Sequence, residues 1–102
     1  MSVRKAGEAI TLNEGAELTA AYRSAHPTER KGHLIGMDLI NKILGQSGCE
    51  GIRIYHGQNR DAQRELVLVG VDTNGNDMHL GIIADRLSPC PNTCSSSNPL
   101  NG

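Results

Sequence analysis

The feature that most constrains the fold is a stretch from Gly51 to Asp85 in which apolar runs are separated by two turn-rich gaps. Asn74-Gly75 lies in the second gap, and this pair suits the positive backbone angles of a tight hairpin turn. The stretch therefore predicts a three-stranded antiparallel sheet, with the last two strands paired directly. The predicted strands cover residues 52–56, 65–72 and 77–85.

The turn also predicts which residues share a face of the sheet. With Asn74 and Gly75 as the two turn residues, the expected cross-strand pairs are Val71 with Met78, Val69 with Leu80, and Val67 with Ile82. We expect this face to meet the helices. The opposite face carries Leu66 and Leu68 and is more apolar than a solvated sheet face. A second subunit is the preferred cover for it, and a C-terminal tail folded back on the sheet is the alternative.

Two helices are predicted before the strands. Thr11 and Glu14 fit a capping box, which predicts a helix from Leu12 to Ala25. A second apolar stripe over residues 37–46 predicts another helix, with glycines at both ends. Leu34-Ile35 is open to two interpretations, a short extended piece or an early helical turn.

These elements predict an α+β fold in one domain of 102 residues. We expect two N-terminal helices packed on a three-stranded antiparallel sheet, followed by an extended C-terminal tail. The expected parts are an N-terminal arm over residues 1–10, a core over 11–88, and a Pro/Cys/Ser-rich tail over 89–102.

Composition excludes several classes of partner. Ten basic and eleven acidic residues give a formal charge of −1, so no excess of positive charge draws the chain to nucleic acid. No apolar run has membrane-spanning length, and no signal peptide is recognisable. Three cysteines do not suggest a disulfide-stapled secreted domain. The expected location is the cytoplasm.

Cys90 and Cys94 are the candidate metal ligands, because two thiolates at this spacing form half of a zinc site. The second pair is missing, since Cys49 stands alone. The expected faces of the sheet also separate His56 from His79. Isolated thiols or a disulfide within the tail are therefore the preferred interpretation, and no cofactor is expected.

Nothing in the sequence assembles a recognisable active site. No glycine-rich phosphate loop and no G-x-S-x-G motif are present, which argues against nucleotide enzymes and serine hydrolases. The run from Asp72 to Asp77 resembles a calcium loop, but its glycine and its final acidic position do not match. We read that run as a turn.

The best candidate binding surface is the polar connection over residues 57–64 together with the end of the strand before it. A plain solvated connection is the alternative. The candidate binding residues are Tyr55, His56, Gln58, Asn59, Arg60 and Arg64.

Three segments resemble small uncharacterised proteins from Bacteroidetes-type bacteria, namely residues 48–57, 66–72 and 89–94. The resemblance implies a recurring compact module and supplies no activity or catalytic residue. We expect a non-enzymatic protein-interaction module that acts as a homodimer and contacts a protein partner. A zinc-binding or thiol-dependent protein using Cys90 and Cys94 is one alternative, and a small-ligand-binding domain with a pocket between helix and sheet is another.

Overall fold

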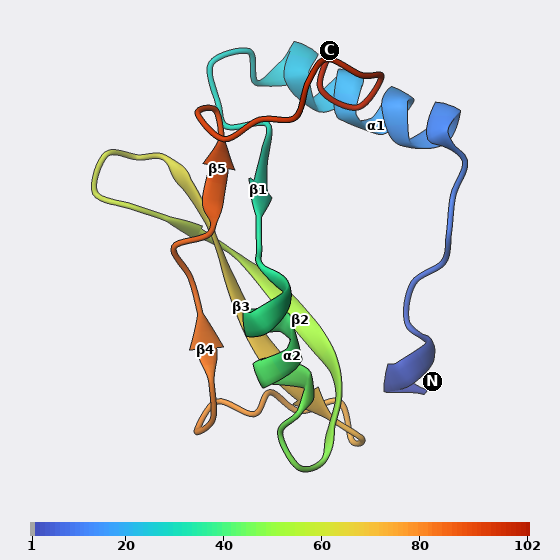
Figure 1. Ribbon diagram of the computed structural model, residues 1–102, viewed down its shortest axis with the longest axis vertical. Helices are drawn as coiled ribbons and strands as arrows, with labels where there is room; N and C mark the ends of the chain where they lie inside the picture. Colours follow the sequence, from blue (N-terminus) through green and yellow to red (C-terminus); the bar gives the residue numbers. More distant parts are fainter. Residues whose placement is uncertain (1) are drawn as a thin grey trace. The chain divides into compact units, whose positions relative to one another are not determined.

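The computed structural model describes residues 2–102, which group into two compact units that we describe separately. The first unit contains the described residues up to Gly7 together with Ile35–Leu87, and the second contains Glu8–Leu34 and Ser88–Gly102. Helices and antiparallel sheets are both present, which confirms the predicted α+β class (Figure 1).

The first unit is built on an antiparallel sheet with strand order β2-β3-β4. β2 and β3 form a long hairpin, and β4 is a short strand on the far side of β3. A 3-10 helix, η1, and the helix α2 complete the unit. Their bounds are η1 Val3–Lys5, α2 Met37–Leu44, β2 Cys49–Gln58, β3 Arg64–Asp72 and β4 Ile83–Ala84.

The predicted three-stranded antiparallel sheet is present, but the extent of its third strand and the predicted register are wrong. The predicted strand over residues 77–85 is reduced to β4, and Leu68 pairs with Ala84 while Val69 pairs with Ile83. The cause lies in the turn, where Asp72 Oδ1 accepts hydrogen bonds from the backbone N–H groups of residues 74 and 76, at 2.9 and 3.0 Å. This wider turn replaces the two-residue one, because a short acidic side chain competes for the amides that a tight hairpin would use.

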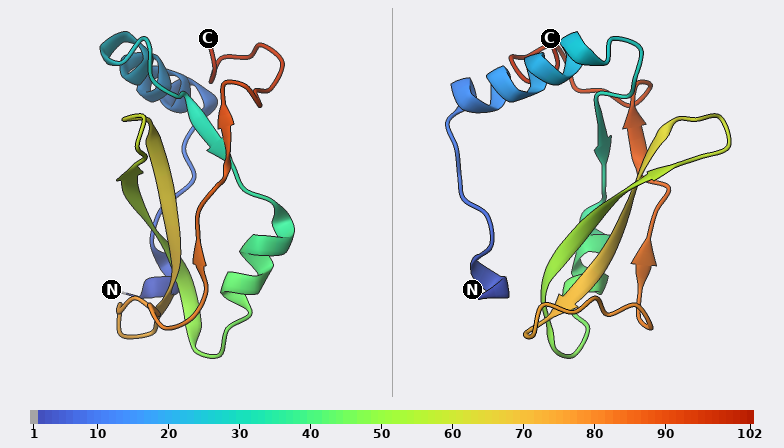
Figure 2. Two further views of the ribbon diagram at one scale, coloured as in Figure 1. Left: turned by 90° about the vertical axis from the view of Figure 1, so that its left-hand side faces the viewer. Right: turned by 180° about the vertical axis from the view of Figure 1, so that it is seen from behind.

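The covered face of the sheet is also the opposite of the predicted one. Leu68, which is 4% exposed, belongs to one apolar cluster with Ile43 of α2, and Leu66 and Ile52 pack against that cluster. Figure 2 shows α2 on one side of the β2–β3 hairpin. The face that carries Leu66 and Leu68 is therefore covered by α2 within the same chain, and it needs neither a second subunit nor the tail.

α2 is held to the segment before β4 by one side chain. Gln46 Oε1 accepts a hydrogen bond from the backbone N–H of Ile82 at 2.9 Å, and Gln46 Nε2 donates to the carbonyl oxygen of Ile43 at 2.9 Å. Gly81 makes room for this side chain, because a Cβ atom there would lie 2.1 Å from Gln46 Oε1. A side-chain amide thus replaces the backbone pairing that the predicted strand would have supplied.

The second unit consists of α1 Leu12–Ala25 and a two-stranded antiparallel sheet of β1 Gly32–Leu34 and β5 Ser88–Cys90. α1 has the predicted bounds, and Thr11 Oγ1 accepts a hydrogen bond from the backbone N–H of Glu14 at 3.1 Å, as the capping signal requires. Leu34 is the end of a strand, which settles its open assignment.

The predicted tail begins inside a strand. Pro89 and Cys90 belong to β5, and a disulfide joins Cys90 to Cys94 directly after it. No residue of α1 is buried, so the packing of α1 on the sheet stays a prediction, as does the extended tail. None of the helices in the described part of the chain has the length and apolar character needed to cross a bilayer.

Candidate functional site

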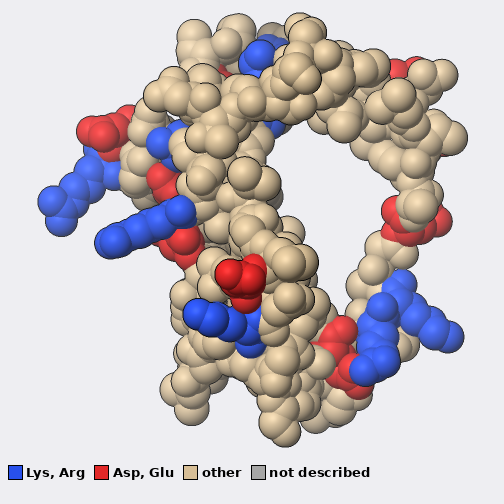
Figure 3. Space-filling view, in the orientation of Figure 1, with Lys and Arg blue, Asp and Glu red and all other residues tan. Residues whose placement is uncertain are grey.

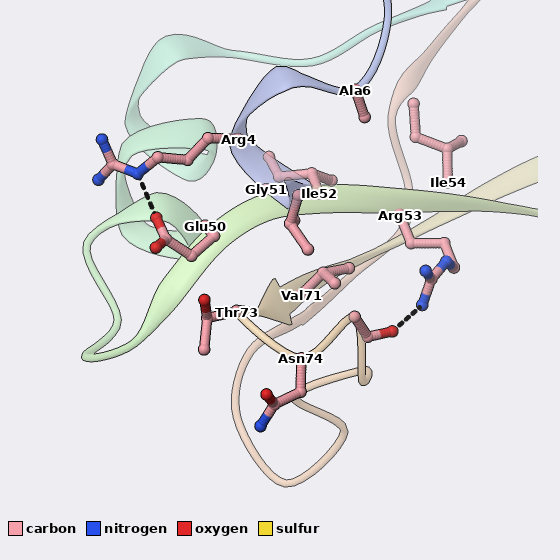
Figure 4. Close-up of a pocket in the computed structure, with 12 residues that line it drawn as sticks. Arg4, Ala6, Glu50, Gly51, Ile52, Arg53, Ile54, Val71, Thr73 and Asn74 are labelled. Carbon is pink, nitrogen blue, oxygen red and sulfur yellow. Dashed lines mark hydrogen bonds and ion pairs between the residues drawn. The ribbon is translucent and has the colours of Figure 1, made fainter. Parts of the chain in front are cut away.

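A groove of about 590 Å³ lies on the first unit, between the N-terminal segment and the start of β2 (Figure 4). η1 forms one wall, and the turn at residues 73–75 forms another. Val3 approaches β2 closely, since a Cβ atom on Gly51 would lie 3.1 Å from Val3 Cγ1. The absence of a side chain at position 51 therefore lets the N-terminal segment sit beside the strand.

Two arginines lie at opposite ends of this groove (Figure 4). At one end, Arg4 donates a hydrogen bond to Glu50, which raises the pKa of Arg4. At the other end, Arg53 Nη1 donates to the carbonyl oxygen of Gly75 at 3.2 Å and to Asp77. Each guanidinium thus already has a carboxylate partner, and the groove carries little net charge.

Asp77 accepts hydrogen bonds from two side chains of β2. Tyr55 Oη donates to Asp77 Oδ2, and Arg53 donates to Asp77 Oδ1. The hydrogen bond from Tyr55 to Asp77 raises the pKa of Tyr55. In the same way, the hydrogen bond from Arg53 to Asp77 is the main cause of the raised pKa of Arg53. The hydrogen bond from Tyr55, with a further contribution from Arg53, lowers the pKa of Asp77. The cluster holds a neutral phenol, a carboxylate and a guanidinium in one place.

The predicted binding loop is a short ordered turn rather than an eight-residue connection. Gly57 and Gln58 belong to β2 and pair with Glu65 and Arg64 of β3. Within the turn, Asn59 Oδ1 accepts hydrogen bonds from the backbone N–H groups of residues 61 and 63, at 2.9 and 3.0 Å. Asn59 is therefore occupied with holding the turn together.

The other candidate binding residues do not converge on one site. Tyr55 points to Asp77, whereas His56 Nδ1 lies 3.4 Å from Arg64 Nη1, near the hairpin end. Arg60 and Gln58 are exposed. Tyr55 and His56 are consecutive in β2, so their side chains point to opposite faces of the sheet.

The sequence interpretation missed Arg53 and Asp77. One signal was available for Arg53, because it alternates with Tyr55 along a strand and so shares its face. Asp77 gave no comparable signal, since its position above β2 depends on the wider turn at Asp72.

A second groove, of about 570 Å³, lies on the second unit beside the Cys90–Cys94 disulfide. In a disulfide neither sulfur is a thiolate, and a cysteine binds zinc as a thiolate. No group of three or more potential metal ligands occurs among residues 2–102. The metal interpretation of Cys90 and Cys94 stays a prediction for the reduced form of the chain.

Another alternative from the sequence is a small-ligand-binding domain with its pocket between helix and sheet. The groove on the first unit is instead bounded by the N-terminal segment and the turn, and the groove on the second unit by β1 and the segment after β5. On the face shown in Figure 3, Lys and Arg side chains are dispersed among Asp and Glu and form no continuous patch.

Comparison of the chain with models of protein families, with curated proteins and with solved structures finds no match. The resemblance to Bacteroidetes-type proteins therefore stays a prediction.

Proposed function

We propose that this chain is a non-enzymatic protein-interaction module that forms a homodimer, in which the free edge of β2 pairs with the same edge of a second copy. The observation that carries the proposal is the position of β2 at the end of the sheet, where β3 is its one strand neighbour in the described part of the chain. β2 is 10 residues long. A long strand edge presents a row of unpaired N–H and C=O groups, which favours pairing with another chain.

A hydrogen bond on the other side of the sheet indicates which groups point to that edge. The backbone N–H of Met78 donates to the carbonyl oxygen of Gly70 at 2.8 Å, so Gly70 directs its backbone groups away from β2. In an antiparallel pair of strands, when the backbone N–H and C=O of one residue point away from the partner strand, those of its cross-strand partner also point away, toward the opposite edge. That partner is Ile52, and alternation extends the pattern to Ile54 and His56. These three residues are therefore the ones whose N–H groups would pair with a second copy.

The side chains at the centre of β2 support the same interface. Ile54 and Tyr55 are 55% and 47% exposed, although both are large and carry apolar surface. Antiparallel pairing of β2 with its copy has two-fold symmetry, the commonest symmetry of homo-oligomers. With Ile54 at the two-fold axis, it would place the Ile54 side chains of the two copies opposite each other, and such cross-strand pairs stabilise a sheet. Of the six candidate binding residues, Tyr55, His56 and Gln58 would then lie at the interface.

The test uses two substitutions at one position. Ile54→Pro removes an N–H group that points to the free edge, and proline is tolerated at such positions of edge strands. Ile54→Ala removes the side chain but keeps the N–H group. Native mass spectrometry over a range of concentrations should show a dimer for the original chain and for Ile54→Ala, and a folded monomer for Ile54→Pro.

A chain that stays monomeric at all concentrations contradicts the proposal, as does an Ile54→Pro variant that still dimerises. Circular dichroism of each variant establishes that it is folded before its mass is interpreted. The cytoplasmic location remains part of the proposal, and cell fractionation tests it.

A further inference from the structure

The groove on the second unit has features that an edge-to-edge dimer does not use. Its volume of about 570 Å³ lies within the range of pockets that take small organic molecules. Both sulfur-bearing residues of the disulfide line it, as do Lys31 and His33, and its described lining contains no Asp or Glu. The Cys90–Cys94 bond, which a thiolate can attack, therefore borders a cavity whose charged lining residue is the cation Lys31.

Strand pairing leaves the disulfide open to an incoming group. Gly32 is the cross-strand partner of Cys90, and cross-strand partners project to the same side of a sheet. A Cβ atom at Gly32 would meet no atom within 4 Å, so the space next to Cys90 is unfilled. Cys94 is the exposed residue of the disulfide and Cys90 is half-buried, so an incoming solute meets Cys94 first.

Lys31 is held at the wall of this groove by two contacts. Its backbone N–H donates to the carbonyl oxygen of Cys90 at 2.7 Å, and its Nζ donates to the carbonyl oxygen of Asn101 at 3.0 Å. Both acceptors are neutral carbonyl groups, so these bonds do not neutralise the ammonium charge. An anion in the groove would therefore be attracted by Lys31.

We propose that this groove binds a small anionic thiol peptide, whose thiolate exchanges with the Cys90–Cys94 disulfide. The thiolate forms a bond to Cys94 Sγ as the bond between the two cysteines breaks, and Cys90 leaves as a thiolate that takes a proton from water. One S–S bond replaces another, so no separate oxidant or reductant is needed. The products are a mixed disulfide at Cys94 and a thiol at Cys90.

This chemistry fits the predicted compartment. Disulfides in the cytosol are mostly transient and take part in redox reactions, whereas structural disulfides belong to oxidising compartments. The inference does not depend on the dimer proposed above, since the groove and its lining residues belong to the second unit alone.

The experiment compares an anionic thiol with a neutral one on the oxidised full chain. Reduced glutathione is the anionic peptide, and β-mercaptoethanol is the neutral thiol. Samples are quenched with N-ethylmaleimide, which alkylates the thiol released at Cys90, and the adduct is located by tandem mass spectrometry. Lys31→Gln should slow the glutathione reaction by about two- to fivefold, the effect of losing one partly exposed charge pair. It should slow the β-mercaptoethanol reaction less, because that thiol brings no charge besides the thiolate itself, whereas glutathione also carries carboxylates.

A matched pair of glycine variants tests access to the groove. Gly32→Val fills the space next to Cys90, so it should slow both thiols. Gly36→Val makes the same change at a glycine outside the groove, where a Cβ atom likewise meets nothing within 4 Å, and should leave both rates unchanged. Circular dichroism controls for folding.

Three results from the variants and the adduct mapping would overturn the inference. They are an equal effect of Lys31→Gln on both thiols, an adduct located on Cys90, and an unchanged rate in a folded Gly32→Val variant. A disulfide that does not react with glutathione at all would overturn it as well.

Discussion

Tyr55 donates a hydrogen bond through its phenol oxygen to the carboxylate of Asp77, and this contact joins β2 to the segment that follows β3. Asp77 forms a bridge with Val71 at the end of the turn, which brings its carboxylate over the face of β2 that carries Tyr55 and Arg53. Tyr55 and Asp77 are not cross-strand partners, so a side-chain hydrogen bond and not backbone pairing holds them together.

The contact predicts the titration of Tyr55. Its hydrogen bond with Asp77 raises the pKa of Tyr55, whereas Arg53 lowers it. We therefore expect the pKa of Tyr55 to fall in Asp77→Asn and to rise further in Arg53→Gln. Ultraviolet absorbance of the phenolate measures both in a Tyr22→Phe background, which leaves one tyrosine in the chain. An Asp77→Asn variant whose Tyr55 titrates as in the original chain would refute the assignment.

Stability in acid should depend on Asp77. The pKa of Asp77 is lowered in the folded state, so its contribution is present above the pKa of the unfolded chain, about 3.9, and is lost as pH falls through the lower folded value. The free energy of unfolding should exceed that of Asp77→Asn at neutral pH, and the difference should shrink below about pH 4. Urea unfolding at a series of pH values measures this. A difference that stays constant into strong acid would contradict the prediction.

Leu68 should stabilise the first unit, because it lies in the apolar core of that unit. It is 4% exposed and packs with Ile43, so Leu68→Ala should lower the free energy of unfolding by about 2–5 kcal/mol. Ile54→Ala, at a position 55% exposed, should lower the stability of the monomer by about 1 kcal/mol or less. Urea unfolding compares the two variants at a concentration where the chain is monomeric. Similar losses for both would mean that α2 does not cover the Leu68 face.

Gln46 and Gly81 should be energetically coupled. Gln46→Ala leaves the backbone N–H of Ile82 without its acceptor and should cost about 1–3 kcal/mol. Gly81→Ala should disturb the same bond, because its Cβ atom would lie 2.1 Å from Gln46 Oε1. The double variant should therefore be less destabilised than the sum of the two single variants, as a double-mutant cycle of unfolding measurements would show. Strict additivity would indicate that the two residues act independently.

The start of α1 should depend on one hydroxyl group. Thr11→Ala removes the oxygen that accepts the hydrogen bond from the backbone N–H of Glu14 and should destabilise the helix by about 1 kcal/mol. Thr11→Ser keeps that oxygen and serves as the control. Circular dichroism during thermal unfolding compares them. Equal melting of the two variants would show that the cap contributes nothing.

Sequence reasoning worked best where neighbouring residues decide the structure. Thr11 and Glu14 marked the start of α1 because a cap acts over three positions, and α1 has its predicted bounds. The same reasoning failed after Asp72, whose side chain competes with the hairpin for amide groups. A tight turn and a wider one use the same residue types, so composition does not separate them.

The alternation of apolar residues in β3 predicted correctly that residues 66 and 68 share a face. It did not indicate which face α2 would cover, because both faces are apolar and alternation is the same for each. Which face is covered depends on the path of the chain between α2 and β2.

By itself, the sequence determined the α+β class, the extent of α1, the start of α2, and the presence of a β2–β3 hairpin, because capping, periodicity and turn preference act within a few residues. The tertiary structure alone decided the pairs that are distant along the chain, Tyr55 with Asp77, Gln46 with Ile82, and Gly32 with Cys90. Such pairs form only once the chain has closed the loops between them, and loop closure is governed by the whole fold rather than by local preference.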